Sequence, residues 1–151
     1  MKKIISIVLL LALCLSLCAC GATSASGMKF VGTYEDKGQL SVGYSGWGMN
    51  NLVDYVSYTE TLELDNGGTG TYKSVATSQG KYHKVGDVIE KGTVTWKSDG
   101  EYVTISIRGI RYDKSYGNNT EEPFDRTSTY EMKAGTLHDA SSGSLAYTKI
   151  G

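Results

Sequence analysis

The clearest fold signal lies at Gly92-Thr-Val-Thr-Trp-Lys-Ser-Asp-Gly-Glu-Tyr-Val-Thr-Ile-Ser-Ile107. Apolar and polar residues alternate on both sides of Asp99-Gly100, which places Val94 and Trp96 on one face of the first run. This period of two is typical of half-buried β-strands. Asp-Gly between two such runs favours a type I′ turn, so the segment predicts a β-hairpin.

Similar runs rich in Thr, Tyr, Val and Ile recur along the chain between clusters of Gly, Asp and Asn. They predict strands over Lys29–Glu35, Tyr58–Leu64, Gly70–Val75, Thr93–Lys97, Tyr102–Ile107, Ser128–Met132 and Leu145–Ile150. Asp65-Asn66-Gly67-Gly68 predicts a second hairpin, and Ala134-Gly135 a third that turns toward Leu137. Helix signals are nearly absent, so the fold class is all-β, an antiparallel meander.

Two stretches do not follow this pattern. Residues 39–56 contain three glycines, aromatic residues and Asn-Asn-Leu-Val-Asp-Tyr, which is compatible with a helical turn, a further strand or a long loop. Residues 110–126 are polar and contain the single Pro123, so we expect a loop or an irregular edge. Loops of this length in a small domain are usually functional or mobile.

The N-terminus has the pattern of a secretion signal. Lys2 and Lys3 precede a run from Ile4 to Leu15 that is apolar except for Ser6 and is too short for the roughly 20 residues of a membrane-spanning helix. The following Leu17-Cys18-Ala19-Cys20-Gly21 resembles the lipobox of bacterial lipoproteins, in which the cysteine matching Cys20 is lipidated. This resemblance implies a signal peptide over residues 1–19 and a lipid anchor such as palmitate on Cys20. An ordinary secretory signal cleaved near Ala19 is the alternative.

Residues 20–27 are small and polar, so they predict a flexible tether that carries the domain of residues 28–151 on the extracytoplasmic face of the cell membrane. The three cysteines all lie at or before position 20, which excludes a disulfide or a catalytic thiolate in that domain. The formal net charge of the chain is −1 and no basic stripe occurs, so nucleic acid is not an expected partner. We expect a monomer.

The order of these elements resembles the lipocalin-like (calycin) domains of small bacterial lipoproteins. The resemblance is carried by Phe30-Val-Gly-Thr-Tyr34, by the Leu62–Tyr72 segment, by Gly92–Trp96 with Asp99-Gly100, and by Tyr130–Leu137. Lipocalins proper have Trp where this chain has Tyr34, and a second lipocalin signature is missing, so no particular ligand is carried over. The resemblance implies a single up-and-down β-barrel, either hollow with a small ligand or filled by side chains.

Residues with catalytic or metal-binding chemistry are sparse. His83 and His138 have no His or Cys at metal-ligand spacing, and we expect both at the surface. Asp65-Asn66-Gly67 is explained by turn chemistry, and Glu121-Glu122 by solvation on a polar segment. The sequence therefore predicts neither an enzyme nor a metal site nor a cofactor.

Aromatic residues are the one compositional excess, with 11 tyrosines. Tyr44, Trp47 and Tyr55 lie in or beside the glycine-rich segment, where no regular strand demands them, and Trp96 lies on the predicted hairpin. Such side chains suit recognition because they offer large faces and lose little conformational entropy. We take these four as candidate ligand contacts. Capping of the barrel mouth is the alternative for the first three.

These observations favour a non-catalytic binding role for a lipid-anchored lipoprotein, with a small or apolar ligand in the barrel. Two alternatives remain. One is a β-sandwich surface module that binds a glycan or a protein through exposed aromatic residues such as Tyr44 and Trp47. The other is a structural envelope protein with a filled barrel.

Overall fold

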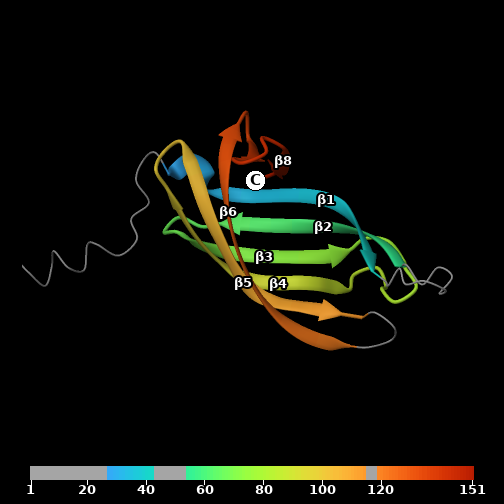
Figure 1. The fold of residues 1–151 in the computed structure, drawn as a ribbon. Coiled ribbons are helices and arrows are strands. Elements are labelled where there is room, and N and C mark those ends of the chain that lie inside the picture. Colours follow the sequence, from blue (N-terminus) through green and yellow to red (C-terminus); the bar gives the residue numbers. More distant parts are fainter. Residues whose placement is uncertain (1–26, 43–53, 115–118) are drawn as a thin grey trace, which may run out of the picture.

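The computed structural model describes residues 27–42, 54–114 and 119–151, and it has the form of a single closed antiparallel β-barrel (Figure 1). Its strands follow one another around the barrel in sequence order, as predicted for a meander. A short 3-10 helix, η1 (Met28–Phe30), precedes β1 (Gly32–Val42), β2 (Asp54–Leu64), β3 (Thr69–Ala76), β4 (Val88–Ser98), β5 (Tyr102–Asp113), β6 (Thr120–Lys133), β7 (Thr136–Asp139) and β8 (Leu145–Lys149). The predicted all-β fold class is confirmed.

The three predicted hairpins are present, although one turn type was wrong. Ala134 and Gly135 both have positive φ, as a type I′ turn between β6 and β7 requires. In the β4–β5 turn only Gly100 has positive φ, which excludes type I′ there. The Asp99 carboxylate instead accepts hydrogen bonds from the backbone N–H groups of Glu101 and Tyr102, and these bonds stabilise a different turn.

The expectation of a loop or irregular edge over residues 110–126 was wrong for most of that stretch. β5 continues to Asp113 and β6 begins at Thr120, and the two strands pair regularly between these ends. Alternation was hidden because both faces of the sheet are polar here. Of residues 39–56, β1 includes those up to Val42 and β2 those from Asp54.

One end of the barrel is closed by its own side chains. The inward-facing residues there form a continuous apolar core that includes Tyr72, Trp96 and Ile105. The core also contains Phe30, Tyr34, Leu62, Leu64, Val94, Val103, Ile107, Leu137 and Tyr147. η1 covers this end, and the Tyr34 hydroxyl donates a 2.7 Å hydrogen bond to the carbonyl of Phe30. We call it the closed end.

Two glycines make room for aromatic rings inside the barrel. Gly92 on β4 and Gly109 on β5 are partners in register, flanked by Tyr72 on β3 and Phe124 on β6. The rings of Tyr72 and Phe124 meet edge to face, with centroids 6.3 Å apart. The backbones at the two glycines approach so closely that any Cβ would collide with the neighbouring strand. Such glycine kinks let a sheet coil tightly enough to close.

The other half of the barrel is open at its side. β8 pairs with β1 at Tyr34 and Glu35, and β7 pairs with β6 only from Tyr130 onward. In Figure 1, β1 continues along the top of the barrel while β6 runs toward the lower right, so the two strands diverge. Within the described residues, β1 from Asp36 onward and β6 before Thr129 therefore each have a strand partner on one side only. We call this part the open half.

Candidate functional site

A row of polar residues crosses the inner face of the barrel where the closed end meets the open half. The strand register places these residues side by side on six successive strands. They are Asp36, Glu60, Ser74, Glu90, Arg111 and Glu122. Inward positions of a small barrel are usually apolar, so such a row needs an explanation.

Four of the charged groups in this region form a connected network, which we call the charged cluster: Glu60, Glu90, Arg111 and Arg126. Arg111 Nε lies 2.6 Å from Glu90 Oε1, and Arg126 contacts Glu90 at 3.5 Å and Glu60 at 3.9 Å. The Glu90 side chain is only 9% exposed, whereas those of Arg126 and Arg111 are 38% and 52% exposed. The two carboxylates are therefore sheltered, while the guanidinium groups reach solvent.

Tyrosines connect the charged cluster to the core of the closed end. The hydroxyl of Tyr72 donates to Glu90, and that of Tyr147 donates to Glu60. The Arg126 guanidinium lies 4.5 Å from the Tyr72 ring centroid and 5.6 Å from that of Phe124. Burial alone would lower the pKa of Arg126, but the neighbouring tyrosines and Glu60 more than offset it, so the pKa is raised. Arg126 stays charged at every working pH.

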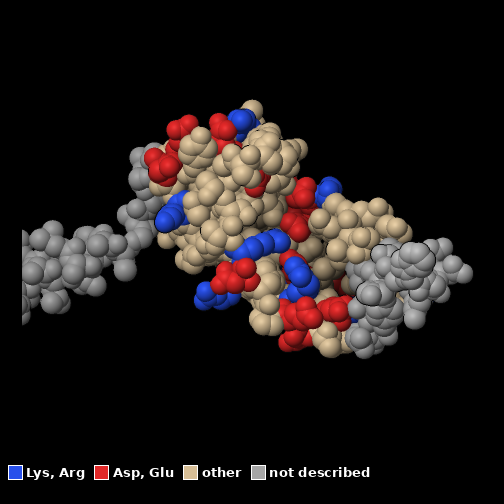
Figure 2. Space-filling view, in the orientation of Figure 1, with Lys and Arg blue, Asp and Glu red and all other residues tan. Residues whose placement is uncertain are grey.

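This arrangement suits a ligand with charged or hydrogen-bonding groups. A space-filling view shows acidic and basic side chains gathering over β5 and β6 beside the open half (Figure 2). Among the described residues no group of three or more His, Cys, Asp or Glu is placed to hold a metal ion. The chemistry available is thus ion pairing, hydrogen bonding and cation–π contact.

The candidate ligand contacts from the sequence lie in three different environments. Tyr44 and Trp47 fall outside the described residues. Tyr55, near the start of β2, is 60% exposed. Trp96 belongs to the core of the closed end. The structure thus does not bring Tyr55 and Trp96 together.

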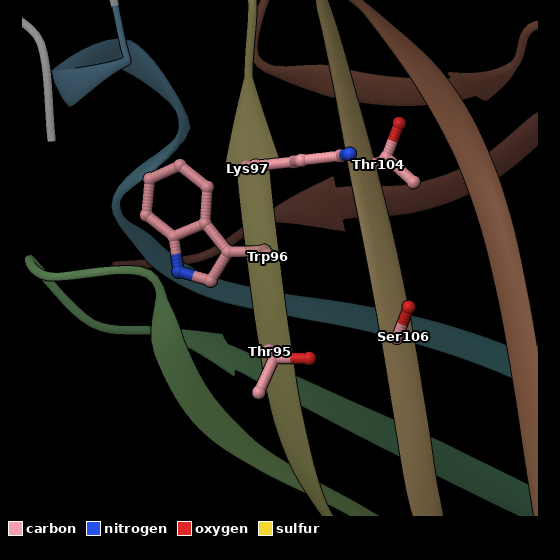
Figure 3. Close-up of a pocket in the computed structure, with 5 residues that line it drawn as sticks. All are labelled: Thr95, Trp96, Lys97, Thr104 and Ser106. Atoms are coloured by element: carbon pink, nitrogen blue, oxygen red, sulfur yellow. The ribbon is translucent and has the colours of Figure 1, made fainter. Parts of the chain in front are cut away.

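The indole of Trp96 points into the barrel and is held by two backbone carbonyls. Its Nε1 donates to Asp65 at 3.1 Å and to Thr69 at 3.0 Å, at the two sides of the β2–β3 turn. Figure 3 shows it leaving β4 on the side opposite to Lys97. A shallow depression lies on the outer side, lined mainly by hydroxyl groups of β4 and β5. Trp96 is therefore a packing residue that ties a turn to the core.

The two histidines differ from each other in burial. His83 was expected at the surface, and this was wrong, because only 2% of it is exposed. The β3–β4 connection folds back on itself, with the Gly80 N–H donating to the His83 carbonyl and the Lys84 N–H to the Asp87 carboxylate. This folding buries the imidazole. His138 is half-buried on β7.

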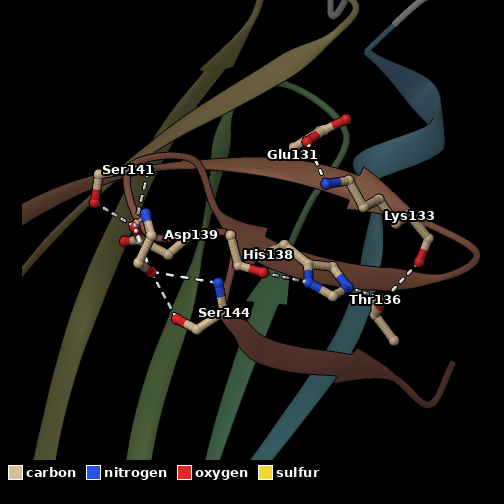
Figure 4. Close-up of polar contacts among 9 residues, drawn as sticks. Glu131, Lys133, Thr136, His138, Asp139, Ser141 and Ser144 are labelled. Carbon is tan, nitrogen blue, oxygen red and sulfur yellow. Dashed lines mark hydrogen bonds and ion pairs between the residues drawn. The ribbon is translucent and has the colours of Figure 1, made fainter.

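The polar β7–β8 turn is a second cluster, but its groups bond to one another. His138 lies between the Thr136 hydroxyl and the Gly143 carbonyl, at 2.9 and 3.1 Å (Figure 4). The Asp139 carboxylate accepts hydrogen bonds from Ser141 and Ser142, which lower its pKa. These hydrogen bonds stabilise the turn, and the Asp139 carboxylate is already hydrogen-bonded within it.

The charged cluster was missed by the sequence analysis, although one of its members carried a signal. Glu60 lies within the predicted strand Tyr58–Leu64 and shares the apolar face of Leu62 and Leu64. A carboxylate on a core-facing position is a warning of a buried polar network. Arg126 gave no such signal, because no strand was predicted over residues 110–126. Its side chain could therefore not be assigned to the inner or the outer face.

Removing Arg126 tests how strongly the cluster is coupled to folding. An Arg126→Met variant leaves Glu60 and Glu90 without this cation, and we expect a loss of about 1–3 kcal/mol in the free energy of unfolding. Arg108→Met is the matched control, because Arg108 pairs with Asp125 on the outer face with side chains 82% and 54% exposed. Exposed pairs contribute little, so this control should change stability by under about 0.5 kcal/mol. Equal losses in urea titrations would contradict the prediction.

The buried tyrosines should make the barrel sensitive to alkali. Burial raises the pKa of Tyr34 from 10.0 to about 12 and also raises the pKa values of Tyr72 and Tyr147. Between pH 10.0 and about pH 12, Tyr34 loses its proton in the unfolded chain but keeps it in the folded chain, so the unfolded chain binds fewer protons. The free energy of unfolding should then fall by about 1.4 kcal/mol per pH unit for each such tyrosine. This stabilisation is complete below pH 10 and is lost as pH rises toward 12.

Urea titrations from about pH 8 to about pH 11 measure this slope. A Tyr34→Phe variant serves as its control, because it removes one titrating group and should give a shallower decline. An unchanged slope in Tyr34→Phe would show that Tyr34 does not contribute.

Comparison of the chain with protein-family models, with curated proteins and with solved structures gave no match. Along the described ranges, no helix has the length and apolar character needed to cross a bilayer. The function of the chain is therefore inferred from its residues and their geometry.

Proposed function

We propose that this chain is a lipid-anchored extracytoplasmic lipoprotein with a lipocalin-like barrel and a non-catalytic binding role. Its ligand is a small molecule with charged or hydrogen-bonding groups, bound in the open half of the barrel. The observation that carries this proposal is the charged cluster, with Glu90 sheltered and Arg111 facing solvent. A partly desolvated set of fixed charges favours a polar ligand over bulk water.

The packing of the closed end supports placing the ligand in the open half. Tyr72, Trp96 and Ile105 are 1%, 6% and 2% exposed and fill the closed end together with their neighbours. In the open half, Val56, Ala76 and Ile89 form a second, smaller apolar cluster that is also buried. Apolar surface beside a few fixed polar groups is the usual composition of a small-molecule site.

Native mass spectrometry of the full chain, purified in detergent from host membranes, tests the ligand proposal. The wild type is expected to carry a bound mass beyond its acyl chains and detergent, and an Arg111→Met variant should lose it. Arg108→Met, with its outward-facing ion pair, is the matched control and should keep the mass. A wild type that carries no such bound mass, or equal amounts of bound mass in Arg111→Met and Arg108→Met, would refute a ligand at the charged cluster.

Membrane attachment depends on Cys20 in this proposal. A Cys20→Ala variant should lose labelling by an alkyne-bearing palmitate analogue and leave the membrane fraction, because two acyl chains are needed for stable anchoring. A Cys18→Ala variant is the control, since the lipobox match puts the acylated residue at Cys20, and it should stay labelled. Unchanged labelling of Cys20→Ala would remove the anchor from the proposal.

One observation favours a second candidate, surface recognition of a glycan or protein. The Tyr55 ring is large, 60% exposed and next to the end of β2 that borders the open half. Loss of glycan retention on a polysaccharide column in Tyr55→Ala, with the charged cluster intact, would favour this candidate over the first.

A further inference from the structure

We propose that the free edge of β1 in the open half binds an extended basic segment of another protein by adding it to the sheet as a further strand. This goes beyond the proposed function, because it uses backbone groups of β1 and a different class of partner. Strand addition is a common mode of peptide recognition in which backbone hydrogen bonds give affinity and alternate side chains give specificity.

The hydrogen bonds at the closed end show which backbone groups of β1 face its free edge. The Thr33 N–H donates to the carbonyl of Gly151, and its carbonyl accepts from the Ile150 N–H, so Thr33 points toward β8. Backbone direction alternates along a strand. Lys37, Gln39 and Ser41 therefore direct their N–H and C=O groups to the same side, where β8 no longer pairs. Their side chains are exposed on the outer face.

The opposite edge of the opening, on β6, is protected against pairing. The Thr129 carbonyl accepts from the Ala140 N–H, so odd-numbered residues of β6 face its free edge. Pro123 is one of them and has no N–H to offer, and Glu121 and Asp125 flank it. Proline and charges are the usual protection of an exposed edge. The free segment of β1 has one charged edge-facing residue, Lys37, and no proline, so all of its edge-facing residues keep an N–H and it is the edge that can accept a strand.

The charge beside this edge selects the partner. Asp36 points inward, is level with Glu60 in the strand register, and has no hydrogen bond or ion pair to any described residue. Tyr58 lies over Gly38, one inward position further along β1. A strand added to β1 would place one of its inward side chains beside Asp36 and the next beside the Tyr58 ring. Lys or Arg at these positions would pair with the carboxylate and stack on the ring.

The probe is a fluorescent peptide of about nine residues in which Thr and Lys alternate, a typical strand length and pattern. Fluorescence anisotropy with the full chain in detergent measures its binding. We expect the Thr–Lys peptide to bind and a Thr–Glu peptide of the same length not to bind. A Thr–Lys peptide with N-methyl groups on alternate residues, which cannot donate along the edge, should also fail. Binding by the Thr–Glu peptide, or equal binding of the N-methylated one, would overturn the proposal.

A Gln39→Pro substitution removes one N–H from the free edge while leaving the β1–β2 hydrogen bonds in place. It should weaken Thr–Lys peptide binding by at least about tenfold, whereas Gln39→Thr should bind like the wild type. Asp36→Asn should weaken binding of the Thr–Lys peptide. If Gln39→Pro binds the peptide fully, or the edge instead pairs with a second copy of the chain in cross-linking, this inference fails. Small-molecule binding at Arg111 would stand.

Discussion

A Gly109→Ala variant is expected to lose about 3–5 kcal/mol in the free energy of unfolding, a large part of the stability of a small domain. The added Cβ would overlap the Lys91 carbonyl oxygen and lie 2.7 Å from the Gly92 Cα. Both are backbone atoms of the paired strand, so no side chain can rotate away. The β4–β5 pair must separate, and the ring contact between Tyr72 and Phe124 separates with it.

Urea unfolding monitored by tryptophan fluorescence and circular dichroism measures this loss. Gly143→Ala is the matched control, because Gly143 has φ of +70° and no heavy atom within 4 Å of the added Cβ. It carries only the conformational penalty of a left-handed residue, about 1–2 kcal/mol. A Gly109→Ala variant no less stable than Gly143→Ala would mean that the strands separate at little cost.

The second large effect is expected for Trp96→Ala, with a loss of about 3–5 kcal/mol. The indole is 6% exposed, fills the closed end and donates to the carbonyls of Asp65 and Thr69. Its removal leaves a cavity and breaks both side-chain hydrogen bonds to the β2–β3 turn, while the backbone bond from the residue 96 N–H to the Gly68 carbonyl stays.

Trp96→Phe separates these contributions, because it keeps most of the apolar surface and loses the N–H with a smaller part of the ring. We expect a loss of about 1–2 kcal/mol for this variant. A Trp96→Ala variant with wild-type stability would contradict a packing role and return Trp96 to the candidate ligand contacts.

Much of the fold was predictable from the sequence because the closed end follows simple rules. Around Val94, Trp96 and Ile105, apolar residues alternate strictly, and the turns carry Gly, Asp or Asn. The outer parts of β5 and β6 gave no such pattern. There the inward residues, such as Arg111 and Glu122, are as polar as the outward ones, so the alternation that identifies a strand is lost.

The candidate site was harder to predict for a different reason. Its members come from four strands, and only the three-dimensional register brings Glu60, Glu90, Arg111 and Arg126 together. A single sequence gives the face of each residue at best, not its partners around the barrel. His83 illustrates a related limit, since its burial depends on how a connection folds back, which local composition does not determine.

The junction between β1 and β8 also determines the order in which the barrel opens. Every other pairing joins neighbours along the chain, whereas this one joins residues as far apart as Tyr34 and Lys149 through two partner pairs. Contacts of such separation form late in folding, because a long loop must be closed first. The amides of Thr33 and Ile150 should thus exchange with solvent early, while those of Ile105, inside the long β4–β5–β6 sheet, should exchange last. The barrel therefore behaves as a stable curled sheet whose two ends are joined by the short β1–β8 pairing, which separates first.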